Sequence, residues 1–166
     1  NPWSDITSSE TVYNKYQISK SGWIDNNTLG IIKWEVTVKC NDKNSTLKGK
    51  TITDNMLKAG QKVSIKIGND TIDATVASDG ELVLPDSIGD NNEVVISYET
   101  KVADYDLGDP DSSGYYSVKN TAGIDGFHSD KTVYYKPVNE KSKTVLDISQ
   151  NGSKVTYKWQ VEVKQT

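Results

Sequence analysis

Apolar and polar residues alternate along most of this chain, which is the period of a β-strand with one buried face. The clearest case is the run IIKWEVTVK at 31–39, in which Ile32, Trp34 and Val36 share a face and Glu35 lies on the other. Other runs alternate in the same way or are rich in β-branched and aromatic residues. They lie at 11–20, 50–54, 62–67, 71–76, 81–84, 93–102, 115–122, 131–136 and 154–163.

Clusters of Asn, Asp, Gly and Ser separate these runs, at 25–27, 78–80, 89–92 and 151–153. These residues favour turns, so they mark where the chain reverses between strands. The stretch at 54–60 is expected to hold one short helical turn, and no other segment has a helical pattern. The sequence therefore predicts an all-β fold, an Ig-like antiparallel β-sandwich.

Composition narrows the class of protein. The chain has 166 residues, of which 34% are hydrophobic, and a net charge of −4. Every basic residue apart from the single histidine is a lysine, so no guanidinium group is present to read phosphate or guanine, and we expect no nucleic-acid partner. No apolar run is long enough to insert in a membrane. Cys40 is the one cysteine, which permits no internal disulfide, and we interpret it as a small residue near a strand end.

The chain also contains an internal repeat. TVYNKYQISKS at 11–21 aligns without a gap to TVYYKPVNEKS at 132–142, and KWEV at 33–36 resembles KWQV at 158–161. The spacing corresponds to one Ig-sized module. We therefore expect a linker at 1–10, a complete module at 11–137, and at 138–166 the opening strands of a following module or the closing strands of the same domain.

Three polar residues fall on strand faces that otherwise carry core residues: Lys20, Asp54 and Asn120. An amine, a carboxyl and a carboxamide are each costly alone in an apolar interior, but together they can satisfy one another. They can also react. Burial favours the neutral amine, which is a nucleophile, and the neutral acid, which can polarise the Asn120 carbonyl and shuttle a proton to departing ammonia. The product is a Lys20–Asn120 isopeptide bond, formed without a cofactor.

Each of these residues also has a simpler interpretation. Lys20 could extend its amine to solvent from a strand end, Asp54 could cap the following turn, and Asn120 could serve a β-bulge. Glu35 is the second candidate for the acid, disfavoured because alternation turns it outward.

The order ISKSGWID…GIIKWEVTVK…LKGKTITDNM…VISYETKV…VKNTAG resembles the Ig-like modules of Gram-positive surface adhesins and pilins, of the self-crosslinking collagen-adhesin type. The resemblance covers roughly 11–136. In that family a lysine in a K-[ST]-G stretch, an acid in a T-[IV]-x-D strand and an asparagine in a late N-x-A strand are joined, and the matching positions are Lys20, Asp54 and Asn120. Cys40 is a departure, since relatives often carry asparagine there.

The resemblance implies a structural and adhesive module of an extracellular, cell-wall-anchored surface protein, with adjacent modules as its partners. It is not an enzyme with turnover, because the one reaction happens once per molecule. A host matrix protein or a glycan is a further possible partner, and a carbohydrate- or matrix-protein-binding module of a secreted protein is the alternative function. Trp3 and Trp23 are too scattered to argue a glycan platform.

Four further expectations remain. Lys141 corresponds to Lys20 in the repeat and is expected to be an unreacted amine, and the apolar face of 154–163 is expected to be buried. The acidic stretch at 104–111 lacks the spacing of an EF-hand calcium loop and is interpreted as a solvated turn. His128 is interpreted as a turn residue without a nucleophile nearby.

Overall fold

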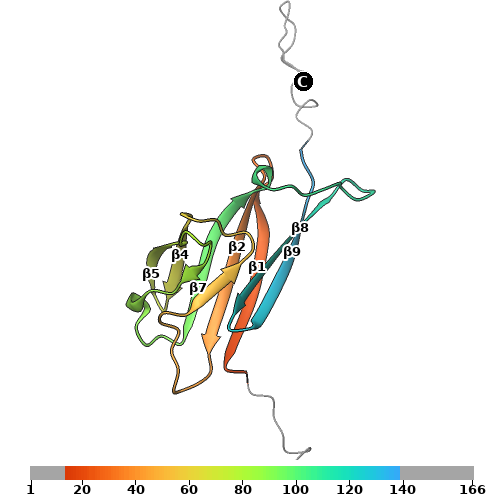
Figure 1. The fold of residues 1–166 in the computed structure, drawn as a ribbon. Helices are drawn as coiled ribbons and strands as arrows, with labels where there is room; N and C mark the ends of the chain where they lie inside the picture. The colour runs from red at the N-terminus through yellow and green to blue at the C-terminus, as the bar shows by residue number, and fades with distance from the viewer. Residues whose placement is uncertain (1–13, 139–166) are drawn as a thin grey trace, which may run out of the picture.

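The computed structural model describes residues 14–138 and consists of two antiparallel β-sheets packed face to face (Figure 1). The five-stranded sheet has the order β1 (Tyr16–Asn26), β2 (Ile31–Cys40), β7 (Glu93–Lys101), β4 (Lys62–Ile67), β5 (Asp70–Thr75). The four-stranded sheet has the order β6 (Leu82–Val83), β3 (Thr51–Asp54), β8 (Tyr116–Ile124), β9 (Phe127–Tyr135). The prediction of an all-β sandwich is confirmed.

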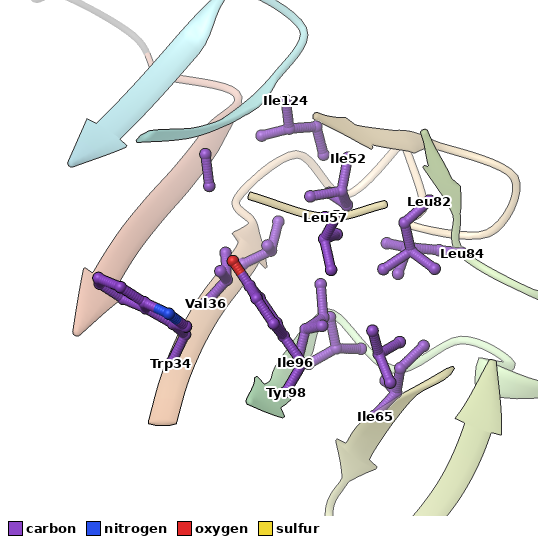
Figure 2. Packing of buried hydrophobic residues seen from close by; sticks show 14 of the residues in the cluster. Trp34, Val36, Ile52, Leu57, Ile65, Leu82, Leu84, Ile96, Tyr98 and Ile124 are labelled. Carbon is purple, nitrogen blue, oxygen red and sulfur yellow. The ribbon is translucent and has the colours of Figure 1, made fainter. Parts of the chain in front are cut away.

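The core lies between the sheets and is built from the alternating faces that the sequence predicts. In β2, Ile32, Trp34, Val36 and Val38 are all buried. Figure 2 shows apolar side chains of both sheets meeting in this layer, with Ile52 of β3 among those that face the five-stranded sheet. Removing these side chains from water supplies the main driving force for folding.

The edge strands β1 and β9 of the two sheets run next to each other (Figure 1). No backbone ladder joins them, but the Lys20 amide donates a hydrogen bond of 3.1 Å to the Ser129 hydroxyl. The described chain enters at the start of β1 and leaves after β9, at opposite ends of the sandwich (Figure 1). A force that pulls the two ends apart therefore acts along the long axis of the sandwich.

Several sequence expectations about local structure are wrong. β1 continues to Asn26, beyond its predicted end at residue 20, because its whole length pairs with β2. The segment at 54–60 forms a hydrogen-bonded turn and no helix, while two 3₁₀ turns occur elsewhere, η1 (Asp86–Ile88) and η2 (Val102–Asp104).

His128 is not a turn residue but a strand residue, paired with Gly123 across the β8–β9 hairpin. The turn is the dipeptide Asp125-Gly126, in which both residues have positive φ, at 50° and 85°. A two-residue hairpin turn of this kind requires positive φ at both positions, which Asp-Gly tolerates well. The chain therefore reverses before His128, and not at it.

The expectations for the linker at 1–10, for the tail at 138–166 and for Lys141 concern residues that lie outside the described ones, apart from Val138 itself. They stay predictions, as do the repeat and the boundary near residue 137.

Candidate functional site

Lys20 lies in the middle of β1 with its side chain directed into the sandwich. Its side chain has no exposed surface, so the alternative of an amine reaching solvent does not hold in this structure. The Lys20 Nζ donates a hydrogen bond of 2.6 Å to Asp54 Oδ2 and a longer one of 3.3 Å to the Tyr98 hydroxyl. The amine is therefore held between an acid from the other sheet and a phenol from its own.

Asp54 ends β3, where its backbone pairs with Ala122 of β8. Oδ2 accepts from Lys20, and Oδ1 accepts a hydrogen bond of 3.0 Å from the Met56 amide. The second contact caps the turn after β3, so the capping role suggested by the sequence exists alongside the ion pair. Because both sheets contribute one partner, the Lys20–Asp54 pair is a contact between the sheets.

Asn120 is a regular β8 residue opposite Lys131 and not part of a β-bulge. It is fully buried, and its Nδ2 donates a hydrogen bond of 2.7 Å to the Tyr98 hydroxyl. Its Oδ1 is buried without a hydrogen-bond partner. A buried carbonyl in this condition costs free energy on the order of 1–3 kcal/mol, so it is unusual in a well-packed core.

The three residues singled out in the sequence thus meet at one place, and Tyr98 is the fourth member that sequence reasoning missed. Tyr98 lies on the core face of β7, two residues after Ile96, and Figure 2 shows its hydroxyl pointing away from its own strand between the sheets. The alternation in VISYET places Tyr98 on the core face and was the one available signal. An aromatic residue on a core face, however, is normally interpreted as a packing residue.

Trp34 and Gly22 shape the slot that holds the amine. The Lys20 Nζ lies 5.2 Å from the centroids of both the Trp34 and the Tyr98 ring, which favours a cation there. Gly22 pairs with Trp34, and a Cβ at Gly22 would come within 2.4 Å of the indole ring. The glycine of the K-S-G stretch therefore gives the indole its place beside Lys20. The indole Nε1 donates a hydrogen bond of 2.9 Å to the Thr100 hydroxyl, and this bond fixes the orientation of the ring.

Burial changes the acid–base properties of two groups in the site. The pKa of Lys20 is lowered from its ordinary value, chiefly because burial penalises the ammonium, while the Asp54 charge opposes this shift. The pKa of Tyr98 is raised far above its usual range by burial and by the charge of Asp54. Tyr98 is therefore a neutral phenol that can both accept and donate a hydrogen bond.

The remaining candidates lie elsewhere. Glu35 is on the outer face of β2, as its alternation predicted, and Cys40 is a buried residue at the end of the same strand. In the acidic loop, the carboxylates of Asp106 and Asp111 accept hydrogen bonds from backbone amides of their own turns. Within residues 14–138, no group of three or more His, Cys, Asp or Glu side chains is arranged to hold a metal ion.

Comparisons with known proteins assign no role to this site. No family model matches the sequence, and no curated protein matches it. Among solved structures, the chain is similar to AggA, the major subunit of aggregative adherence fimbriae type I from Escherichia coli, with a TM-score of 0.34 and 12% identity over 78% of this chain and 99% of that one. A likeness this distant carries no argument about function. No helix in the described part is long and apolar enough to cross a membrane.

Proposed function

We propose that this chain is a structural and adhesive module of a bacterial cell-surface protein, stabilised by an amide bond that it forms between its own Lys20 and Asn120. Asp54 assists the reaction. The module acts outside the cell as part of a stalk or adhesin, next to further modules of the same protein. Each molecule reacts once, so the chain is not an enzyme with turnover.

One observation carries this proposal: the amine of a buried amine–carboxylate pair shares the Tyr98 hydroxyl with a buried carboxamide whose carbonyl oxygen has no partner. A core that needed only stability would be served as well or better by apolar residues, because desolvating an ion pair is expensive. Amide formation removes the cost, since Lys20 and Asn120 lose their separate polar groups and Asp54 becomes a neutral acid.

The first step is a proton transfer from the Lys20 ammonium to Asp54 over the 2.6 Å hydrogen bond. It yields two neutral groups, which burial favours. The free amine can then attack the Asn120 Cγ, while the protonated Asp54 supplies a hydrogen bond to the carbonyl oxygen that gains negative charge. The unpartnered Oδ1 is available to receive it.

The second step expels ammonia and restores the carbonyl. In total, an ammonium, a carboxylate and a primary amide become a secondary amide, ammonia and a carboxylic acid, so atoms and charge balance. Aminolysis of an amide is slow in water, but groups held in contact reach effective molarities of about 10⁵ M or more. The rigid sandwich provides this proximity.

A tryptic digest of the full chain tests which two residues the bond joins. Trypsin cleaves after lysine, but not after a lysine whose amine has become an amide. We therefore expect one branched peptide that joins 16–33, uncleaved at Lys20, to 120–131. In Asn120→Ala the segments 16–20 and 21–33 should separate. Finding these two free peptides in the wild-type digest contradicts the proposal.

Asp54→Asn tests the acid. The amide keeps the size of the side chain and an oxygen for the Met56 amide, but it cannot take the Lys20 proton. We expect this variant to fold with Lys20 and Asn120 unjoined, so that its intact mass equals the sequence mass. Glu35→Gln is the matched control on the outer face and should lose ammonia as the wild type does. A complete bond in Asp54→Asn removes Asp54 from the mechanism.

The alternative of a glycan-binding module receives less support from the described residues. Trp23 is 42% exposed and lines a shallow groove on the outer face of the five-stranded sheet with Glu35 and Ser97, whereas Trp34 is buried. One exposed indole does not form the row of aromatic rings that a sugar chain stacks on. We therefore propose no second function.

A further inference from the structure

We infer that Tyr98 is a catalytic residue of the same reaction, whose hydroxyl carries a proton from the attacking Lys20 nitrogen to the departing Asn120 nitrogen. This inference rests on the proposed Lys20–Asn120 bond and adds a path for the last proton, which sequence reasoning assigned to Asp54. The hydroxyl lies between the two nitrogens, 3.3 Å from Lys20 Nζ and 2.7 Å from Asn120 Nδ2.

The chemistry of the intermediate requires such a path. After Nζ has added to Cγ, it is a cationic nitrogen that must lose a proton, while Nδ2 must gain one before it can leave as ammonia. Both nitrogens are bonded to the same carbon, so a direct transfer passes through a strained four-membered ring. A hydroxyl between them widens this ring to six members.

Tyr98 can play this part because its hydrogen-bonding roles can reverse. In the starting state Nδ2 belongs to a planar amide, has no basic lone pair, and donates to the Tyr98 oxygen. In the tetrahedral intermediate Nδ2 becomes an amine with a lone pair, which can accept the Tyr98 proton. In the same step Tyr98 takes the proton of Nζ, to which it is already hydrogen-bonded, so it stays neutral and ends unchanged.

The surroundings keep Tyr98 neutral and leave Asp54 a separate task. Burial is the largest cause that raises the pKa of the phenol, and it still acts once Asp54 is protonated, so Tyr98 does not lose its proton to solvent. Asp54 meanwhile holds the first proton, from Lys20, for the carbonyl oxygen and recovers it when the carbonyl re-forms. The two nitrogens thus exchange a proton through the shared Tyr98 hydroxyl, and the oxygen has Asp54 as its proton partner.

Tyr98→Phe in the full chain tests the relay. The chain is made by cell-free synthesis, and samples are quenched in acid at intervals. The intact mass of each sample then gives the rate of ammonia loss. Loss of a general acid–base group typically slows a reaction by about 100-fold or more, and we expect this for Tyr98→Phe. Tyr105→Phe is the control, because it removes another tyrosine hydroxyl. This hydroxyl donates a hydrogen bond of 2.8 Å to the Met56 carbonyl and lies outside the relay, so the variant should react at the wild-type rate.

Two readouts distinguish a relay role of Tyr98 from a merely structural one. Lys20→Ala, in which no bond can form, is compared with Lys20→Ala/Tyr98→Phe by near-ultraviolet circular dichroism and melting. Both should fold, and the double variant should melt lower only by what the loss of the Asn120 Nδ2 partner costs. Wild-type chain collected unfolded before reaction is also refolded in H₂O/D₂O mixtures. A relay that moves two protons in one step predicts that the rate of ammonia loss depends on the deuterium fraction along a curve, and this measurement does not require Tyr98→Phe to fold.

The outcomes distinguish the two proposals. If the wild type loses ammonia, but Tyr98→Phe does so equally fast or the deuterium dependence is linear, the relay is wrong and the bond stands. If the wild type keeps its full mass, the proposed function itself fails.

Discussion

Pulled by its two ends, the wild-type chain should release about a hundred residues less of contour length than the Asn120→Ala variant, or roughly 350 Å of extended chain. The described chain enters and leaves at opposite ends of the sandwich (Figure 1), so force reaches β1 from one side and β9 from the other. A Lys20–Asn120 bond passes this force directly from β1 to β8. Strands β2 to β7 lie between the two linked residues in sequence and carry no load.

Single-molecule force spectroscopy measures this difference as the length gained when the module unfolds. Lys119→Ala is the control, because Lys119 is exposed and precedes Asn120 in the same strand, so its loss leaves the bond in place. Its trace should match the wild type. Equal length gains in wild type and Asn120→Ala mean that no covalent link shields the intervening strands.

The second large effect is on thermal stability. Lys20→Ala should lower the free energy of unfolding by about 4–5 kcal/mol, by analogy with a disulfide that closes a loop of about a hundred residues. For a domain of this size the melting temperature should fall by about 15–20 °C. The variant also leaves Asp54 without its 2.6 Å partner, which adds to the loss.

Melting curves of the wild type, Lys20→Ala and Lys119→Ala provide the comparison. Removing the exposed lysine should change stability by no more than about 0.5 kcal/mol, as is usual for a surface substitution. If Lys20→Ala melts within a few degrees of the wild type, neither the proposed covalent bond nor the buried pair contributes the predicted stability.

Strand alternation predicted most of the fold and the inward placement of three site residues. The period of two is a local property, so Lys20, Asp54 and Asn120 could each be assigned to a buried face from their own strand. Their meeting depends on topology, because β1 belongs to one sheet and β3 and β8 to the other. The sequence argument for their meeting was that each polar group is costly to bury alone, and the family resemblance pointed to the same three positions.

What the sequence did not reveal has physical causes. Tyr98 looks like a packing residue until β7 is placed beneath β8, where its hydroxyl meets Asn120. The prediction that His128 lies in a turn is wrong because Asp125-Gly126 is itself a hairpin signal and the strand resumes at Phe127. The predicted end of β1 at residue 20 is too early because the strand continues to Asn26 by pairing with β2, and this pairing is a tertiary contact that local alternation does not show.

The intact mass of the purified full chain tests the Lys20–Asn120 bond most directly. We predict a wild-type mass one ammonia below the mass of the sequence, because the new amide forms at the expense of the Asn120 nitrogen. Lys20→Ala and Asn120→Ala should each have the full mass calculated for its own sequence. A wild-type chain that has its full calculated mass contradicts the crosslink.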